Sequence, residues 1–308
     1  MAREQFGVCA EPSLHGYYLL FNALDDREAY IREALSRLPA LIDNFADRYS
    51  ESNLTGVVAI GANYWNELYP ADRPKMLKPF SGIAQEDRYA PSTNYDLYIE
   101  IRSDRADVNH IVSSKVCELL GDSVELAEQV RAFRFLDGRD LTGFVDGTEN
   151  PQGRQRREVA LVKDEDDLSF AGGSYLHIQR YKHNLNLWNT LEQKEQEDVY
   201  ARTKIENIEY KTEDKPLTAH IKRASVKDDE GNSLEILRQS MPYGDMKIQG
   251  LFFVSYCESP IPFEKMLESM VCGENGHSDH LLKYTQAESG AAFFAPSLNF
   301  LESLATHA

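Results

Sequence analysis

The sequence predicts an α+β fold of two modules, each with the element order βαββαβ and an antiparallel sheet. Its 308 residues, of which 42% are hydrophobic and 27% charged, are typical of a globular protein of one large or two ordinary domains. Segments in which apolar residues alternate are interleaved with segments of helical periodicity. Because the same order of elements occurs twice, we divide the chain into an N-terminal module, residues 1–140, and a C-terminal module, residues 141–308.

The N-terminal module has the element order of a ferredoxin-like domain. Alternating apolar residues predict its first strand. Asp25 and Glu28 form the capping-box pattern that starts the next helix, and we expect Pro39 to break that helix. Gly121 follows the second helix at the position of a C-cap. The predicted elements are strand 14–24, helix 25–49, strands 54–60 and 95–102, helix 103–120 and strand 124–136.

The C-terminal module repeats this order without visible sequence similarity to the first. Pro262 stands at the first position of its last helix, and Gly273 follows the end of that helix. The turn pair Asp137-Gly138 marks the join between the modules. The predicted elements are strand 174–182, a polar helix at 191–204, strands 234–240 and 251–257, the helix after Pro262, and a final apolar run at 291–295.

Charge and cysteine content exclude several classes of function. Lysine and arginine total 33 against 50 aspartates and glutamates, so the net charge of −17 should repel nucleic acid and anionic lipid. The chain has no run of about eighteen apolar residues and no export pattern in residues 1–5. The four cysteines lie far apart without a Cys-x-x-Cys pair. We therefore expect a cytoplasmic protein with reduced thiols, and neither nucleic acid nor membrane as a partner.

The segment 142–151 is the most unusual stretch of the sequence. Gly143, Gly147 and the pair Asn150-Pro151 predict a compact turn around Asp146. The segment is either a turn that joins the modules, with Asp146 accepting neighbouring amide protons, or a loop whose backbone approaches a ligand closely.

Two further stretches carry residues with chemical potential. His220 lies between Ala219 and Ile221, where it is either a core histidine or a metal ligand, since imidazole is the commonest metal ligand in proteins. On the predicted strand 234–240, a face that begins apolar ends in Arg238 and Ser240. A buried Arg238 would need an anion or a pocket, whereas a solvated strand end would let it reach water.

Taken together, these stretches resemble the dye-decolorizing peroxidases. The segment 143–147, Gly-Phe-Val-Asp-Gly, followed by Thr148, is similar to the Gly-x-x-Asp-Gly signature of that family. His220 falls where the family has its proximal haem ligand, and Arg238 and Ser240 fall where it has its distal arginine and a distal polar residue. The resemblance covers about residues 10 to 300 and is closest to the short bacterial cytoplasmic subgroup.

This resemblance implies a haem peroxidase with haem b, iron protoporphyrin IX, in the C-terminal module. It implies that hydrogen peroxide is reduced and that bulky phenolic or dye-like donors are oxidised in one-electron steps. His220 would be the metal ligand, Asp146 would carry a proton, and Arg238 would supply positive charge, which a departing hydroxide requires. An Asp146 with an ordinary pKa would favour activity in mildly acid solution unless burial raises that pKa. The loop Gly143–Pro151 would cap the distal side, with Gly147 and Thr148 against the cofactor.

Several further residues are assigned more loosely. Asp279 is our candidate acceptor for the second ring nitrogen of His220, and a helix N-cap is its alternative role. His177 and Arg180, on the first strand of the C-terminal module, are candidates for contacts with a haem propionate. Four other histidines have no sequence context beyond that of solvated or core residues; they are His15, His110, His183 and His307.

A second interpretation is a haem carrier, or a porphyrin- or iron-handling protein, with incidental peroxidase activity. Such a protein needs His220 but has little use for a distal acid and cation, so Asp146 and Arg238 favour catalysis. We expect hydrogen peroxide and small-molecule electron donors as partners, and a homo-oligomer, dimer or higher. The sequence leaves open the relative weight of Asp146 and Arg238 and the route of electrons from surface aromatic residues.

Overall fold

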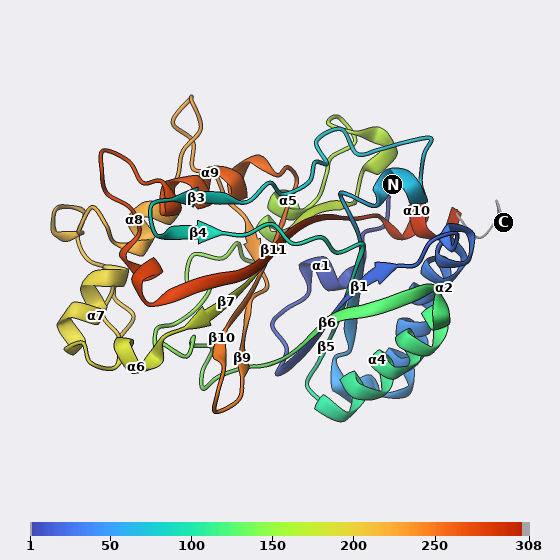
Figure 1. The fold of residues 1–308 in the computed structure, drawn as a ribbon, viewed down its shortest axis with the longest axis horizontal. Helices are drawn as coiled ribbons and strands as arrows, with labels where there is room; N and C mark the ends of the chain where they lie inside the picture. Colours follow the sequence, from blue (N-terminus) through green and yellow to red (C-terminus); the bar gives the residue numbers. More distant parts are fainter. Residues whose placement is uncertain (1, 304–308) are drawn as a thin grey trace.

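The computed structural model describes residues 2–303, and its N-terminal half has the predicted element order (Figure 1). The elements of the first module are β1 (His15–Ala23), α2 (Glu28–Arg48), β2 (Thr55–Gly61), β5 (Leu97–Ser103), α4 (Ala106–Leu120) and β6 (Val124–Phe133). Short additional elements are α1 (Phe6–Cys9), α3 (Trp65–Leu68), β3 (Ile83–Gln85) and β4 (Arg88–Ala90).

The C-terminal half repeats that order with shorter helices. Its elements are α5 (Gln155–Ala160), β7 (Ser174–His183), α6 (Leu185–Trp188), α7 (Gln193–Tyr200), α8 (His220–Ala224), β8 (Leu237–Arg238), β9 (Met241–Gly244), β10 (Gln249–Cys257), α9 (Ile261–Val271), β11 (Thr285–Ala295) and α10 (Leu298–Ser303). Within residues 2–303, no helix has the length and apolar character needed to cross a lipid bilayer.

Three local predictions were wrong. The helix α2 runs through Pro39 without a break, because buried residues such as Leu35 and Leu38 hold it against the sheet and the ring removes only one backbone donor. The same helix begins at Glu28 without a side-chain cap, so the capping box at its start does not form. Of the predicted strand 234–240 only β8 forms, and the separate strand β9 follows after Gln239 and Ser240.

Each module has the same sheet topology. The strand order is β2-β5-β1-β6 in the first sheet, and in the second β10 lies between β7 and the split strand β8/β9, with β11 beyond β7. All these pairings are antiparallel. The two sheets are joined by the pairs β11–β2 and β6–β9, so every strand of this sheet except β8 belongs to a closed ring.

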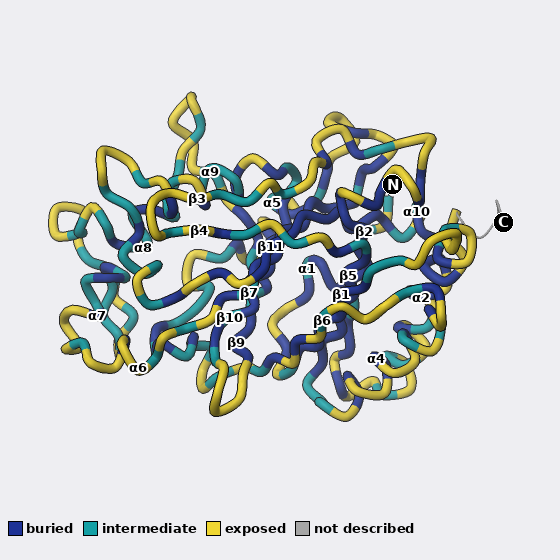
Figure 2. Tube along the Cα trace, viewed as in Figure 1, coloured by how far each residue is buried: buried dark blue, intermediate teal, exposed yellow. Residues whose placement is uncertain are grey.

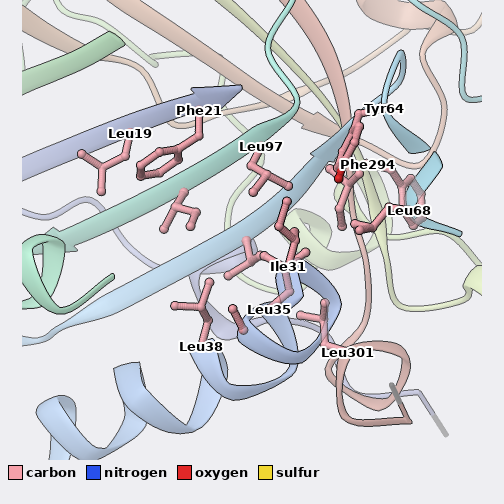
Figure 3. Packing of buried hydrophobic residues seen from close by; sticks show 14 of the residues in the cluster. Leu19, Phe21, Ile31, Leu35, Leu38, Tyr64, Leu68, Leu97, Phe294 and Leu301 are labelled. Carbon is pink, nitrogen blue, oxygen red and sulfur yellow. The ribbon is translucent and has the colours of Figure 1, made fainter. Parts of the chain in front are cut away.

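The core has separate layers on the two faces of the sheets. Between the sheets lies an apolar layer that includes Tyr18, Tyr98, Phe252 and Phe293, and buried backbone follows these strands in Figure 2. On the outer face of the first sheet, α2 and α4 cover a second layer, which Figure 3 shows from Leu19 to Leu301. Because Leu301 belongs to α10, the end of the described chain packs in the core of the N-terminal half.

Candidate functional site

The outer face of the second sheet is hollow where the first sheet has a filled core. A cavity of about 380 Å³ lies between β7, β8 and β10 on one side and α8 and α9 on the other. This volume is in the range of cofactor and ligand sites, roughly 300–1,000 Å³. The cavity is lined by five of the predicted site residues: Asp146, Gly147, Thr148, His220 and Arg238.

His220 begins α8 and faces the cavity with a ring that is held from behind. Its Nδ1 lies 2.7 Å from Oδ2 of Asp279, which is fully buried. The other carboxylate oxygen of Asp279 accepts a hydrogen bond from the backbone N–H of Leu281 at 2.9 Å. Asp279 is therefore both partner of the imidazole and helix cap, and Nε2 is the nitrogen of His220 that remains for a ligand.

Asp146 reaches the cavity from a loop whose turns need glycine. Gly143 has φ of 92° and Gly147 has φ of 75°, in the left-handed region that side chains disfavour. The backbone N–H of Asp146 donates to the carbonyl of Gly138 at 3.0 Å. Burial raises the pKa of Asp146, and the opposing field of Arg238 does not restore the ordinary value of 3.8.

Arg238 is fixed to the same loop by the side chain of Asn150. The Arg238 backbone N–H donates to Oδ1 of Asn150 at 2.8 Å, and Nδ2 of Asn150 donates to the Arg238 carbonyl at 2.7 Å. The Arg238 Nε is buried and has no hydrogen-bond partner among the described residues. The sequence places Asn150 in a turn, and no local pattern in it indicates this clamp.

Besides Asp279, which lies behind His220, three predicted residues lie outside the cavity lining. The Ser240 hydroxyl accepts a hydrogen bond from the backbone of Val254 at 3.2 Å. His177 is buried and stacked on Phe263, with ring centroids 4.2 Å apart, and burial lowers its pKa to about 3. Arg180 forms ion pairs with the half-buried Glu128 and with the exposed Glu288.

Side chains alternate between the two faces of β7, and this explains why His177 and Arg180 do not share one site. Residues three apart on a strand lie on opposite faces, so His177 and Arg180 could not both face one site. The face of His177 continues through Gln179, Tyr181 and His183, and these three line the cavity. His183, which the sequence left without context, is thus part of the site, whereas His307 lies outside the described residues.

Tyr200 and Asp140 also line the cavity and were not predicted. The Tyr200 ring stands edge-on to the His220 ring, with centroids 5.8 Å apart. Asp140 bonds to His183. Both residues lie outside the motif 142–151 and the His220 segment, and only the three-dimensional arrangement brings them to the cavity.

The residues of the cavity fit an iron porphyrin. One imidazole nitrogen is available, and within residues 2–303 no group of three or more His, Cys, Asp or Glu side chains is arranged to hold a metal ion. The apolar walls are suited to a flat macrocycle, and the unpartnered Nε of Arg238 is suited to an oxygen ligand. The apolar lining includes Phe144, Leu251, Phe253, Met266 and Met270.

The chain is similar to known proteins over both of its halves. Residues 5–134 match the family model "Dyp-type peroxidase, N-terminal", and residues 137–300 match "Dyp-type peroxidase, C-terminal". A dye-decolorizing peroxidase from Mycobacterium tuberculosis is 36% identical over 280 residues, which are 90% of this chain and 83% of that protein.

Solved structures are similar over nearly the whole chain. A crystal structure from Shewanella oneidensis, of a protein assigned to the Dyp-type peroxidases, is 55% identical, with a TM-score of 0.96 over 98% of this chain and 99% of that one. A variant of DypB from Rhodococcus jostii RHA1, solved in complex with heme, is 35% identical, with a TM-score of 0.92 over 96% of each chain.

Proposed function

We propose, from the premise that the chain belongs to the Dyp-type peroxidase family, that its cavity holds haem through His220 and uses Asp146 and Arg238 on hydrogen peroxide. The family makes the protein a haem-dependent peroxidase of dye-like donors. The residue assignments rest on one observation: His220, Asp146 and Arg238, from three distant segments of the chain, line a single cavity.

The proposed role of Asp279 is to hold and polarise His220. A carboxylate that accepts the Nδ1 proton fixes the tautomer, so Nε2 carries the lone pair that binds iron. The same contact makes the imidazole more basic, which stabilises the oxidised metal. Bound haem supplies the iron that accepts two oxidising equivalents from peroxide and releases them singly to electron donors.

Asp146 and Arg238 have complementary proposed roles in the cavity. The carboxylate of Asp146 accepts a proton from one peroxide oxygen and delivers it to the other, which leaves as water. The guanidinium of Arg238 supplies the positive charge that stabilises negative charge on the departing oxygen. Gly147 and Thr148, which line the cavity beside Asp146, are the proposed contacts of the loop with the cofactor.

We also propose a domain boundary, a cellular location and an oligomeric state for the chain. A division near residue 140 is supported by the equal strand order of the two sheets. A cytoplasmic location is supported by four free cysteines, which persist in a reducing compartment. The homo-oligomer remains a prediction from the sequence.

Rapid mixing of the haem-loaded protein with hydrogen peroxide tests the function. We expect Asp146→Asn or Arg238→Leu, or both, to slow the spectral change by about 10²- to 10⁴-fold, the usual contribution of a positioned acid or base. His220→Ala should lose the spectroscopic signature of histidine ligation. Unchanged peroxide kinetics in both distal variants would show that these residues are misassigned. A wild-type protein that binds haem but is inert to peroxide would be a carrier.

A further inference from the structure

A buried acid–histidine pair lies in the cavity and has no part in the chemistry assigned above. His183, the last residue of β7, places Nε2 3.0 Å from Oδ1 of Asp140 and Nδ1 2.8 Å from the hydroxyl of Thr285, the first residue of β11. The side chains of His183 and Asp140 are 5% and 10% exposed. This contact connects the ends of two neighbouring strands to the chain segment that leads to Asp146.

The second oxygen of Asp140 organises that segment. Oδ2 accepts hydrogen bonds from the hydroxyl of Thr142 at 2.6 Å and from its backbone N–H at 3.0 Å. The Asp140 backbone N–H donates to the carbonyl of Phe144 at 2.9 Å, and its carbonyl accepts from Gly143 at 2.8 Å. The turn that ends in Asp146 is therefore built around Asp140.

Asp140 keeps a negative charge inside the site. Burial opposes that charge, but His183 and the two donors of Thr142 outweigh burial and lower the pKa of Asp140. The hydroxyl of Tyr200 lies 3.0 Å from that of Thr142, which already donates to Asp140, so Tyr200 donates and extends the chain of hydrogen bonds. The fixed charge of Asp140 acts on Asp146 and favours its protonated form.

We propose that Asp140, held by His183 and through His183 by Thr285, is a positioning residue for Asp146: it anchors the turn 138–146 to β7 and β11, and its negative charge acts on the proton exchange of Asp146. This inference rests on the proposed function, because it concerns the residue to which we assign proton transfer. A merely structural pair would hold the turn without moving the titration of Asp146.

The groups around Asp146 have opposite effects on its protonation. Arg238 from β8, His220 from α8 and the backbone N–H of Gly147 favour the ionised form of Asp146, whereas burial and Asp140 favour the protonated form. Asp140 itself faces His183 and Thr142. Of these groups, only Asp140 places a negative charge near Asp146. Replacing Asp140 with the neutral isostere asparagine should therefore lower the pKa of Asp146.

Infrared titration of the haem-loaded protein, with ¹³C-labelled aspartate, tests the charge. The band of the protonated Asp146 carboxyl is assigned by its absence in Asp146→Asn. In Asp140→Asn we expect its midpoint to move to lower pH, because a negative neighbour is removed while the side-chain shape is kept. Asp167→Asn is the matched control, since Asp167 is also buried but contacts Lys75 away from the cavity. A midpoint that stays in place or rises in Asp140→Asn overturns the proposal.

Amide hydrogen exchange tests the anchoring if Asp140→Asn does not fold. In His183→Ala we expect the amides of Gly143 and Asp146 to exchange about tenfold faster, the equivalent of one lost hydrogen bond. His177→Ala removes a buried histidine from the same face of β7 and should leave these two amides unchanged. Equal acceleration in both variants would overturn the anchoring role. Neither measurement depends on turnover, so either result stands apart from the outcome of the peroxide experiment.

Discussion

Asp279 shows how one side chain can serve structure and chemistry with different atoms. Oδ1 caps the turn that follows it and Oδ2 holds His220, so neither of the two roles predicted from the sequence excludes the other. The cap explains why an aspartate suits this position locally. The contact with His220 depends on two segments 59 residues apart, and the sequence could only suggest it by resemblance to a family.

The two roles of Asp279 can be separated by substitution. Asp279→Asn keeps an oxygen for the Leu281 amide but removes the negative charge beside His220. We expect haem affinity to fall by about 10- to 100-fold, as it does when other residues that hold a metal-ligating histidine are replaced. Transfer of haem to a competing apoprotein measures this loss. Asp279→Ala should weaken haem binding at least as much and also lower the melting temperature. Full retention of haem in Asp279→Asn would contradict the proposed contact.

The raised pKa of Asp146 predicts the pH dependence of the peroxide reaction. The acting form is the carboxylate, and burial raises the pKa above the ordinary value of 3.8. The second-order rate with peroxide should therefore decline, as pH falls, at a higher pH than for an ordinary aspartate. Stopped-flow rates across pH measure this acid limb, and the limb should disappear in Asp146→Asn. A wild-type rate that is flat down to pH 4 would contradict the assignment.

At the scale of elements, the loop 143–151 and strand β8 form one unit through Asn150. Among the described residues, no further strand pairs with the outer edge of β8. The Asn150 amide takes the place of a neighbouring backbone by donating to and accepting from Arg238. A short strand is thereby held at the position where its arginine enters the cavity. The resemblance located both motifs, but it did not indicate that an asparagine side chain ties them together.

Substitution of Asn150 tests this unit. Asn150→Ala leaves the N–H and C=O of Arg238 without partners, and we expect a loss of about 1–3 kcal/mol in the free energy of unfolding. The peroxide rate should fall as well, because Arg238 is no longer fixed. Asn150→Asp keeps the acceptor and loses the donor, so its unfolding free energy in denaturant should lie between wild type and Asn150→Ala. Equal unfolding free energies of all three proteins would show that the hydrogen bonds between Asn150 and Arg238 do not stabilise the fold.

At the scale of the whole molecule, an ion pair is buried between the two sheets. Nε of Arg102 lies 2.5 Å from Oε1 of Glu100, and both side chains are at most 1% exposed. Glu100 also accepts hydrogen bonds from Tyr98 and Tyr256, and Arg102 donates to Gln239, which follows Arg238. The pair thus connects the first sheet with the segment that carries the distal arginine.

Breaking that pair should destabilise the whole fold. In Arg102→Met the carboxylate of Glu100 stays buried without its cation, and we expect a loss of about 3–5 kcal/mol. Urea denaturation measures it. Lys115→Met removes an exposed partner of Glu118 and should cost less than about 1 kcal/mol, which controls for the loss of a charge. A similar small effect in both variants would show that the buried pair does not support the fold.

Periodicity predicted most strands of both modules and the long helices of the first because their apolar faces pack into the core layers on the two sides of the sheets. It failed at Pro39, where packing overrides a local rule, and at Gln239, where the second strand of the C-terminal sheet divides. The motif residues Asp146, His220 and Arg238 line the cavity as the resemblance implied. Asp140, Asn150 and His183 escaped prediction because their partners are chosen by tertiary contacts, which single-sequence patterns do not contain.

Closure of the two sheets into one ring has an evolutionary consequence. Each half supplies the rim strand that the other half needs, through the pairs β11–β2 and β6–β9, and α10 returns to the first core. Either half of the chain, produced alone, would expose unpaired strand edges, which promote self-association. We therefore expect selection to act on the two halves as a single unit.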